Sequence, residues 1–155
     1  MEVQMSDEQK YAHLVRHLEL FRGLSLDDVA EIFHKGMILR FNRDETVFQK
    51  GTRGNLIYVI IEGQIGIYDG ESHLASLDAG ETFGEMGMVF SEPRCASAVA
   101  LAPSMVFALS EDAFEKLLKK RVAVRLLLNI IRPLTRRLRE ANDRLANSED
   151  PASQD

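Results

Sequence analysis

Hydrophobic residues follow two different periods along the chain. In roughly the first 36 residues, and again after residue 110, they recur every three or four positions, as on one face of a helix. Between these parts, turn-forming residues separate short runs rich in β-branched and aromatic side chains, which is typical of β-strands. The pattern therefore predicts helices on both sides of a β-rich segment that spans about residues 37–109.

The β-rich segment divides into short strands. We expect them at residues 37–41, 46–49, 56–61, 64–69, 73–77, 96–101 and 105–109. Asp69-Gly70, between two of these runs, is a strong hairpin pattern. About eight short strands at this spacing indicate a β-barrel or jelly roll rather than an open α/β sheet. The expected fold class is mainly β, with helices before the barrel and a long helix after it.

Residue types that cap helices mark where the shorter helices begin and end. An apolar stripe from Tyr11 to Phe21 predicts a first helix that ends at Gly23. Ser25 is a good N-cap for a second short helix, and Ser110 is one for a third helix after the strands. Each of these helices carries one apolar face that we expect to be buried.

The last helix, from about residue 122 to 146, carries two sets of apolar residues. Leu126, Leu128 and Ile130 are expected to pack on the barrel. The other set is spaced alternately three and four residues apart, as in a coiled coil: Leu127, Ile131, Leu134, Leu138, Ala141 and Leu145. This stripe is too apolar to face water in a small domain, so it predicts a homodimer through paired helices.

Pro133 is the exception inside this last helix. A proline removes one backbone hydrogen bond from a helix interior and costs about 3 kcal/mol or kinks the axis. We therefore expect a bend near residues 129–133, which would act as a hinge between the packed start of the helix and its distal half.

The candidate chemistry gathers in the stretch from Gly80 to Ala98. Gly84 and Gly87 flank Glu85, and Arg94 follows shortly afterwards. Glycines let a backbone approach a ligand closely, and the free amides at a helix start attract an anion. The guanidinium of Arg94 can bind the same anion through two charge-assisted hydrogen bonds, while Glu85 can accept one from a sugar hydroxyl. The combination indicates a pocket for a sugar phosphate of low charge.

A simpler interpretation is open for each of these residues. Gly84 and Gly87 could be ordinary turn glycines, and Arg94 could be a surface arginine paired with Glu92. The complete set inside a strand-rich segment favours ligand binding, because structural context is what confirms a short motif.

The same stretch resembles the phosphate-binding cassette of the cyclic nucleotide-binding domain family. That family includes the catabolite activator and the regulatory subunits of cyclic AMP-dependent kinase. The residues that carry the resemblance are Phe83-Gly84-Glu85-Met86-Gly87-Met88 and Pro93-Arg94-Cys95-Ala96-Ser97. The resemblance runs from about Leu20 to the end of the last helix. It implies that Glu85 takes the ribose 2′-hydroxyl and that Arg94 holds the cyclic phosphate.

The resemblance also implies the rest of the ligand site. Met86, Gly87 and Cys95 stand where the family more often has Leu, Ala, and Ala, Ser or Thr. Together with Arg94, the cassette residues expected at the ligand are Gly84, Glu85, Met86, Gly87, Cys95 and Ala96, and the expected apolar wall is Ile67, Leu74 and Met86. Asn142 falls in the register that reaches the nucleobase, although a solvent-facing asparagine is an equal alternative. Cyclic AMP is the expected ligand and cyclic GMP the second choice, because guanine-selective members often carry Thr at the position of Cys95.

Length and composition add the domain layout. The chain has 155 residues, a net charge of −5 and one cysteine, which allows no internal disulfide. We expect an N-terminal segment at residues 1–19, a ligand-binding domain at 20–146 and a polar tail at 147–155, with the barrel at about 37–109 and the C-terminal helices at 111–146. With no apolar run of eighteen residues and no signal-peptide pattern, we expect a cytoplasmic protein that does not enter a membrane.

Other function classes fit the sequence less well. A cupin enzyme would need clustered histidines, and His73 is the one histidine on a predicted strand; Cys95 has no identifiable base to activate it. A transcription factor of the catabolite-activator type would need a helix-turn-helix domain after the last helix, and none is visible. The basic residues of 116–144 belong to an acidic chain, so they are expected to form a solvated face rather than bind nucleic acid.

We therefore expect a stand-alone cyclic nucleotide sensor without catalytic activity or a cofactor. Its output would pass through its C-terminal helix to a protein partner or a second copy. A degenerate domain that keeps the fold only for protein contacts is the remaining alternative, and the presence of Glu85 and Arg94 argues against it.

Overall fold

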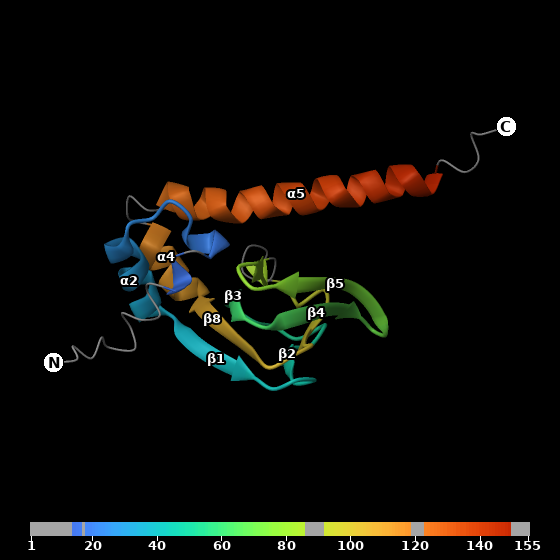
Figure 1. The fold of residues 1–155 in the computed structure, drawn as a ribbon, viewed down its shortest axis with the longest axis horizontal. Helices are drawn as coiled ribbons and strands as arrows, with labels where there is room; N and C mark the ends of the chain where they lie inside the picture. Colours follow the sequence, from blue (N-terminus) through green and yellow to red (C-terminus); the bar gives the residue numbers. More distant parts are fainter. Residues whose placement is uncertain (1–13, 17, 86–91, 119–122, 150–155) are drawn as a thin grey trace.

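Eight strands form two antiparallel sheets of four strands each (Figure 1). The computed structural model describes residues 14–16, 18–85, 92–118 and 123–149. The first sheet has the order β1 (Met37–Phe41), β8 (Ser104–Ser110), β3 (Leu56–Glu62) and β6 (Thr82–Phe83). The second has the order β2 (Thr46–Phe48), β7 (Ser97–Ala100), β4 (Gln64–Asp69) and β5 (Ser72–Asp78).

The prediction of a mainly β fold with flanking helices is confirmed. Within the described residues the strands make two packed sheets, as in a jelly roll, and no closed barrel. The seven predicted strands are all present with ends shifted by at most one residue. The eighth, β6, was not predicted as a strand, because its two residues are too few to form a recognisable β-branched or aromatic run.

The two central strands of the first sheet are buried on both faces. In β3, Ile57 and Val59 point into one apolar cluster, whereas Tyr58 and Ile60 point into another. Successive side chains of a strand point to opposite faces, so a strand between two cores must be apolar throughout. This explains the unbroken hydrophobic run of β3, and β8 divides in the same way. We call the two clusters the helix-side core and the sheet-side core.

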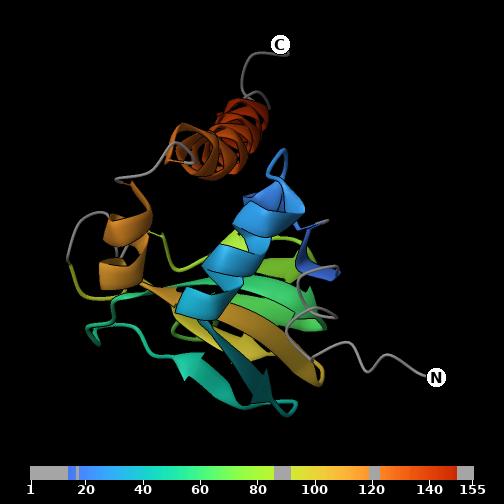
Figure 2. The same cartoon turned by 90° about the vertical axis from the view of Figure 1, so that its left-hand side faces the viewer.

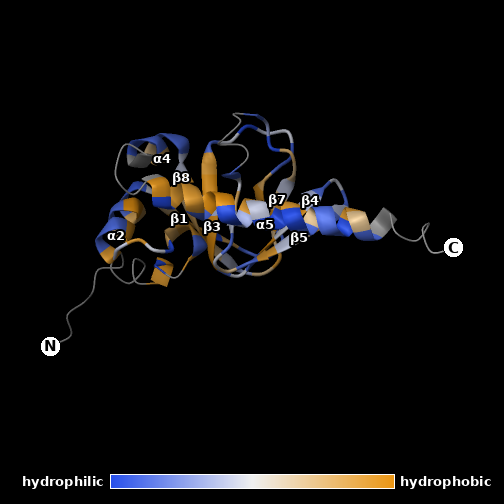
Figure 3. Ribbon diagram, turned by 90° about the horizontal axis from the view of Figure 1, so that it is seen from above, coloured by the Kyte–Doolittle hydropathy of each residue, from blue (hydrophilic) through white to orange (hydrophobic). Residues whose placement is uncertain are grey.

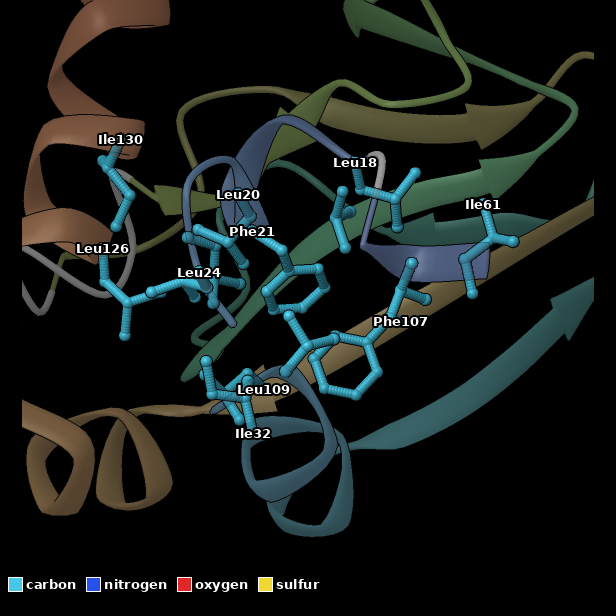
Figure 4. Packing of buried hydrophobic residues seen from close by; sticks show 14 of the residues in the cluster. Leu18, Leu20, Phe21, Leu24, Ile32, Ile61, Phe107, Leu109, Leu126 and Ile130 are labelled. Carbon is cyan, nitrogen blue, oxygen red and sulfur yellow. The ribbon is translucent and has the colours of Figure 1, made fainter. Parts of the chain in front are cut away.

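The helix-side core joins the first sheet to the helices. Figure 4 shows Ile61, Phe107 and Leu109 from the sheet meeting residues of the helices and their connections: Leu18, Leu20, Phe21, Leu24, Ile32, Leu126 and Ile130. The helices are η1 (Glu19–Phe21), α2 (Leu26–Lys35), α4 (Glu111–Leu118) and α5 (Ala123–Glu149). The sheet-side core fills the space between the two sheets, with residues such as Ile65, Leu77, Phe83 and Val106.

Both predicted serine caps are present. The hydroxyl of Ser25 accepts a hydrogen bond from the amide of Asp28 at 3.2 Å, and that of Ser110 accepts one from Ala113 at 3.2 Å. The helix predicted to run to Phe21 is wrong at its end, because Leu18 has an extended backbone with φ −74° and ψ 148°. Burial of the side chains here outweighs helical continuity, and only the short 3-10 turn η1 follows; Tyr11 lies outside the described residues.

The last helix, α5, is continuous over 27 residues and passes through Pro133 without ending there. The expected packing of its start is confirmed for Leu126 and Ile130, which are buried, whereas Leu128 is 36% exposed. Figure 1 shows the distal half reaching beyond η1 and over β4 and β5, and Figure 2 shows α5 above the strands. Seen from above in Figure 3, hydrophobic residues dominate its start and hydrophilic ones its distal half.

Candidate functional site

A pocket of about 250 Å³ lies beside the second sheet, where the stretch after β6 and the segment before β7 meet α5. Its wall is mainly apolar, with four charged side chains set into it. The lining residues are Phe48, Ile67, Ala75, Leu77, Phe83, Gly84, Glu85, Glu92, Pro93, Arg94, Cys95, Ala96 and Arg137. An apolar pocket with a few convergent charged groups is the usual form of a small-molecule site.

Arg94 is buried at this pocket, with 5% of its surface exposed. Its Nη1 donates to the backbone oxygen of Gly84 at 2.7 Å, and its Nη2 donates to that of Leu56 at 2.9 Å. Its Nε is buried and has no hydrogen-bond partner among the described residues. Burial lowers the pKa of Arg94, because the charged form loses hydration. A buried donor without an acceptor is costly, so the Nε is suited to an anionic ligand.

The backbone fixes where Arg94 stands. Its amide donates to the oxygen of Thr52 at 2.8 Å, and its own oxygen accepts from the amide of Gly51 at 2.7 Å. These two bonds tie the segment before β7 to the turn that follows β2. The side chain of Arg94 therefore starts from a fixed point of the fold.

Glu85 is the second buried charged residue of the pocket, with 6% of its surface exposed. Burial raises the pKa of its carboxyl group, and a backbone hydrogen bond and the positive charges of Arg137 and Arg94 oppose that rise. The preceding Gly84 has φ +83°, and a Cβ there would lie 3.0 Å from the Tyr58 ring. Glycine is thus needed to turn the chain so that Glu85 faces the pocket.

Arg137 brings α5 to the same place. Its Nη1 lies 3.2 Å from the Glu85 carboxylate, and its Nη2 donates to the backbone oxygen of Thr82 at 2.7 Å. The residue lies 52 positions after Glu85 in the sequence, yet it lines the pocket. Sequence reasoning missed Arg137, because nothing in the local pattern distinguishes it from the neighbouring Arg136, which pairs with Glu19 at 3.2 Å.

Six of the predicted ligand residues line the pocket together: Ile67, Gly84, Glu85, Arg94, Cys95 and Ala96. Leu74 does not line it and is 53% exposed on β5, and Asn142 is exposed on α5 outside the pocket. Met86 and Gly87 lie outside the described residues. The alternative of a surface arginine at position 94 is wrong, since the side chain is buried.

The described part of the chain contains neither a cluster of metal ligands nor a helix that could span a membrane. No three His, Cys, Asp or Glu residues there lie close enough together to hold a metal ion. None of the helices described there combines the length and the hydrophobicity needed to cross a membrane.

Comparison with known proteins agrees with this geometry. The family model described as cyclic nucleotide-binding domain matches residues 38–121, which are 84 of the 155 residues. The regulatory subunit of cAMP-dependent protein kinase from Candida albicans is 25% identical over 114 residues, covering 74% of this chain and 25% of that protein. The corresponding subunit from Mucor circinelloides is 26% identical over 93 residues, covering 60% and 22%. The chain thus spans about a quarter of the length of these curated relatives.

Solved structures show the same fold. The catabolite activator protein of Thermus thermophilus matches with a TM-score of 0.73 and 29% identity, over 84% of this chain and 63% of that one. A cyclic nucleotide-binding domain from Methylobacillus flagellatus matches with a TM-score of 0.77 and 27% identity, over 90% and 85%. With more than half of its length matched by the family model, the chain belongs to the cyclic nucleotide-binding domain family.

Proposed function

We propose that this protein is a cyclic AMP sensor that binds the nucleotide in the pocket between Arg94 and Glu85. The observation that carries the proposal is Arg94, a pocket-lining residue whose buried Nε has no acceptor among the described residues. The same pocket also holds the buried carboxylate of Glu85. A cyclic nucleotide supplies one phosphate charge for the arginine and one ribose hydroxyl for Glu85. The apolar wall, including Ile67 and Leu77, is suited to the nucleoside.

Cyclic AMP is preferred over cyclic GMP for a chemical reason at Cys95. A thiol is a weaker hydrogen-bond partner than a hydroxyl, so Cys95 is a poor reader of the polar edge of guanine. The relatives that the chain resembles are named as regulatory subunits of cAMP-dependent kinase, which supports the same choice.

The contacts of α5 indicate how ligand binding could change the position of this helix. Glu85 is held by Arg137 on α5, so a ligand hydroxyl at Glu85 changes the balance of contacts that positions the distal half of the helix. A ligand shifts a two-state equilibrium only through such differential contacts. Four residues of the predicted coiled-coil stripe on α5 (Leu127, Ile131, Leu138 and Leu145) are 41–62% exposed in the single chain, and we propose that a second copy covers them.

Calorimetric titration of the purified protein with cyclic AMP, cyclic GMP and 5′-AMP tests the proposal. We expect saturable binding, tightest for cyclic AMP. Arg94→Ala should fold normally and lose roughly tenfold or more in affinity, since the phosphate loses a charged hydrogen-bond partner. Arg94→Lys should also bind weakly, because an ammonium group does not reproduce the guanidinium plane.

Each other outcome identifies an alternative. Tighter binding of cyclic GMP would make the protein a cyclic GMP sensor. Absence of binding to any of the nucleotides by the folded protein would leave the domain as a protein-interaction module. Unchanged affinity in both Arg94 variants would show that the ligand binds elsewhere.

A further inference from the structure

We propose that Phe48 and Gly54 are positioning residues, which hold the guanidinium of Arg94 in one orientation with its Nε edge available to a phosphate. The inference rests on the proposed function, in which Arg94 binds the phosphate of the ligand. Neither residue belongs to the cassette stretch, and both lie about 40 or more positions before Arg94 in the sequence.

Phe48, at the end of β2, supports one face of the guanidinium. The Cζ of Arg94 lies 4.3 Å from the centre of the Phe48 ring and 5.9 Å from that of Tyr58. A guanidinium within about 6 Å of an aromatic centre is attracted by the ring quadrupole, more strongly when both groups are removed from water. Arg94 is buried, which places this contact in the stronger class.

The Phe48 ring is itself held by an aromatic cluster. Its centre lies 5.9 Å from the Tyr58 ring and 6.0 Å from the Phe83 ring, and Tyr58 and Phe83 stack on each other at 4.9 Å. Contacts between rings at these distances fix orientation as well as burying area. Phe48 therefore offers Arg94 a fixed surface rather than a mobile side chain.

Gly54 leaves the room that the guanidinium occupies. A Cβ added at Gly54 would lie 2.8 Å from Nη2, 3.0 Å from Nε and 3.3 Å from Cζ of Arg94. Gly54 is not among the residues with positive φ, so its backbone conformation is open to alanine. The three heavy atoms nearest to such a methyl group all belong to the Arg94 side chain. The variant Gly54→Ala should therefore displace the Arg94 side chain without straining the backbone.

Together these contacts determine the orientation of the guanidinium. Gly84 and Leu56 supply the carbonyl acceptors for Nη1 and Nη2. Phe48 covers one face of the guanidinium, and Gly54 leaves room beside Nη2 and Nε. Nε then remains as the buried donor without a partner. An arginine that is already ordered loses less conformational freedom when the phosphate binds, so preorganisation increases affinity for the phosphate group specifically.

The first test compares cyclic AMP with adenosine, which lacks the phosphate. We expect Phe48→Leu to weaken cyclic AMP binding by roughly three- to thirtyfold, as loss of a cation–π contact implies, with a much smaller effect on adenosine. Phe48→Tyr keeps the ring and should retain the affinity of the unaltered protein. Phe41→Leu is the matched control, because Phe41 packs against the same sheet-side core but does not line the pocket.

The second test uses Gly54→Ala, which adds a single methyl group. We expect weaker binding of cyclic AMP, adenosine binding close to that of the unaltered protein, and little change in melting temperature. In an Arg94→Lys background the same alanine should have a smaller effect, because the obstructed guanidinium is gone. Such non-additivity is the mark of two residues that act through a shared contact.

The outcomes separate this inference from the proposed function. If the unaltered protein does not bind cyclic AMP, or binds it independently of Arg94, the proposed function fails and this inference with it. If binding depends on Arg94 but Gly54→Ala binds cyclic AMP normally, the positioning role is overturned. If Phe48→Leu loses the same affinity for cyclic AMP and for adenosine, Phe48 is only part of the pocket wall. If Phe48→Leu does not fold, the Gly54→Ala variant still tests the positioning role.

Discussion

At the scale of a single residue, Glu85 is a buried charged group that lowers the stability of the folded protein. Its pKa is raised above the ordinary value of 4.5, chiefly by burial, so the folded protein binds the carboxyl proton more tightly than the unfolded chain does. The corresponding contribution to stability is present below the ordinary pKa and is lost as the pH rises through the raised value. At neutral pH the charged Glu85 therefore lowers stability relative to a neutral side chain.

This predicts the behaviour of Glu85→Gln. We expect its melting temperature at pH 7 to equal or exceed that of the unaltered protein, and the difference to disappear as the pH falls below about 4.5. Thermal unfolding followed by circular dichroism between pH 4 and 8 measures this. A variant that is clearly less stable at pH 7 would show that the ion pair with Arg137 outweighs the effect of burial.

The role proposed for Glu85 in binding has a separate test. If Glu85 accepts the ribose 2′-hydroxyl, 2′-deoxy cyclic AMP should bind clearly worse than cyclic AMP, by roughly tenfold for one hydrogen bond to a charged group. Glu85→Ala should reduce that difference, because the acceptor is already absent. Titration of both proteins with both ligands measures the coupling, and additive losses would mean that the two groups do not meet.

At the scale of elements, Asn129 connects α5 to the N-terminal part of the domain. Its Nδ2 donates to the backbone oxygens of Leu20 at 2.7 Å and Arg22 at 3.0 Å, and its side chain is 2% exposed. The carbonyl of Leu20 belongs to η1 and that of Arg22 follows it directly. This short 3-10 turn has few helical hydrogen bonds of its own. One amide group thus replaces bonds that a longer helix would have made internally.

Asn129→Ala should therefore destabilise the domain by about 1–3 kcal/mol, because two backbone acceptors lose their donor in a buried place. Urea unfolding measures the free energy, and an unchanged slope with denaturant would indicate the same folded and unfolded states. Asn142→Ala is the matched control on the exposed side of α5 and should change stability by less than about 0.5 kcal/mol. Equal effects of the two variants would contradict the connecting role of Asn129.

The elements were predictable from the sequence where one local rule decided them. Short runs of β-branched and aromatic residues between turn residues predicted the strands, and the caps at Ser25 and Ser110 marked two helix starts. The first helix failed at Leu18, because tertiary burial of η1 overrides a helical stripe that the local sequence supports equally well. A pattern with a period of three to four residues identifies a face, and it does not show where the backbone leaves the helix.

The candidate site was predictable for the same local reason, and only in part. Gly84, Glu85 and Arg94 lie within eleven consecutive residues, so their spacing was visible in the sequence. Phe48 lines the pocket from β2, and Arg137 lines it from α5. Their positions depend on how β2 pairs in the sheet and how α5 packs on the domain, which the local sequence does not show. Leu74 was expected at the pocket on the resemblance alone, and in the single chain it is exposed on β5.

At the scale of the whole molecule, the exposed apolar stripe of α5 determines the prediction for assembly. Leu138 and Leu145 are each 62% exposed. Figure 3 shows that the distal half of α5 is mostly hydrophilic. We expect the protein to sediment as a dimer, and Leu138→Glu with Leu145→Glu to sediment as a monomer, because buried carboxylates oppose helix pairing. Arg139→Glu, an exposed charge change on the same helix, is the control and should stay dimeric. A monomeric unaltered protein would contradict this prediction.

The double burial of β3 and β8 has a consequence for how such a protein can change over time. Because the helix-side core and the sheet-side core share only the backbone of these strands, substitutions on alternate positions act on separate compartments. Replacements at Ile57 or Phe107 alter how the helices attach, and replacements at Tyr58 or Val106 alter the surroundings of the pocket. A lineage can therefore vary how its helices attach while the sheet-side residues near the pocket stay the same, and Arg137 on α5 is a place where such a change reaches the ligand.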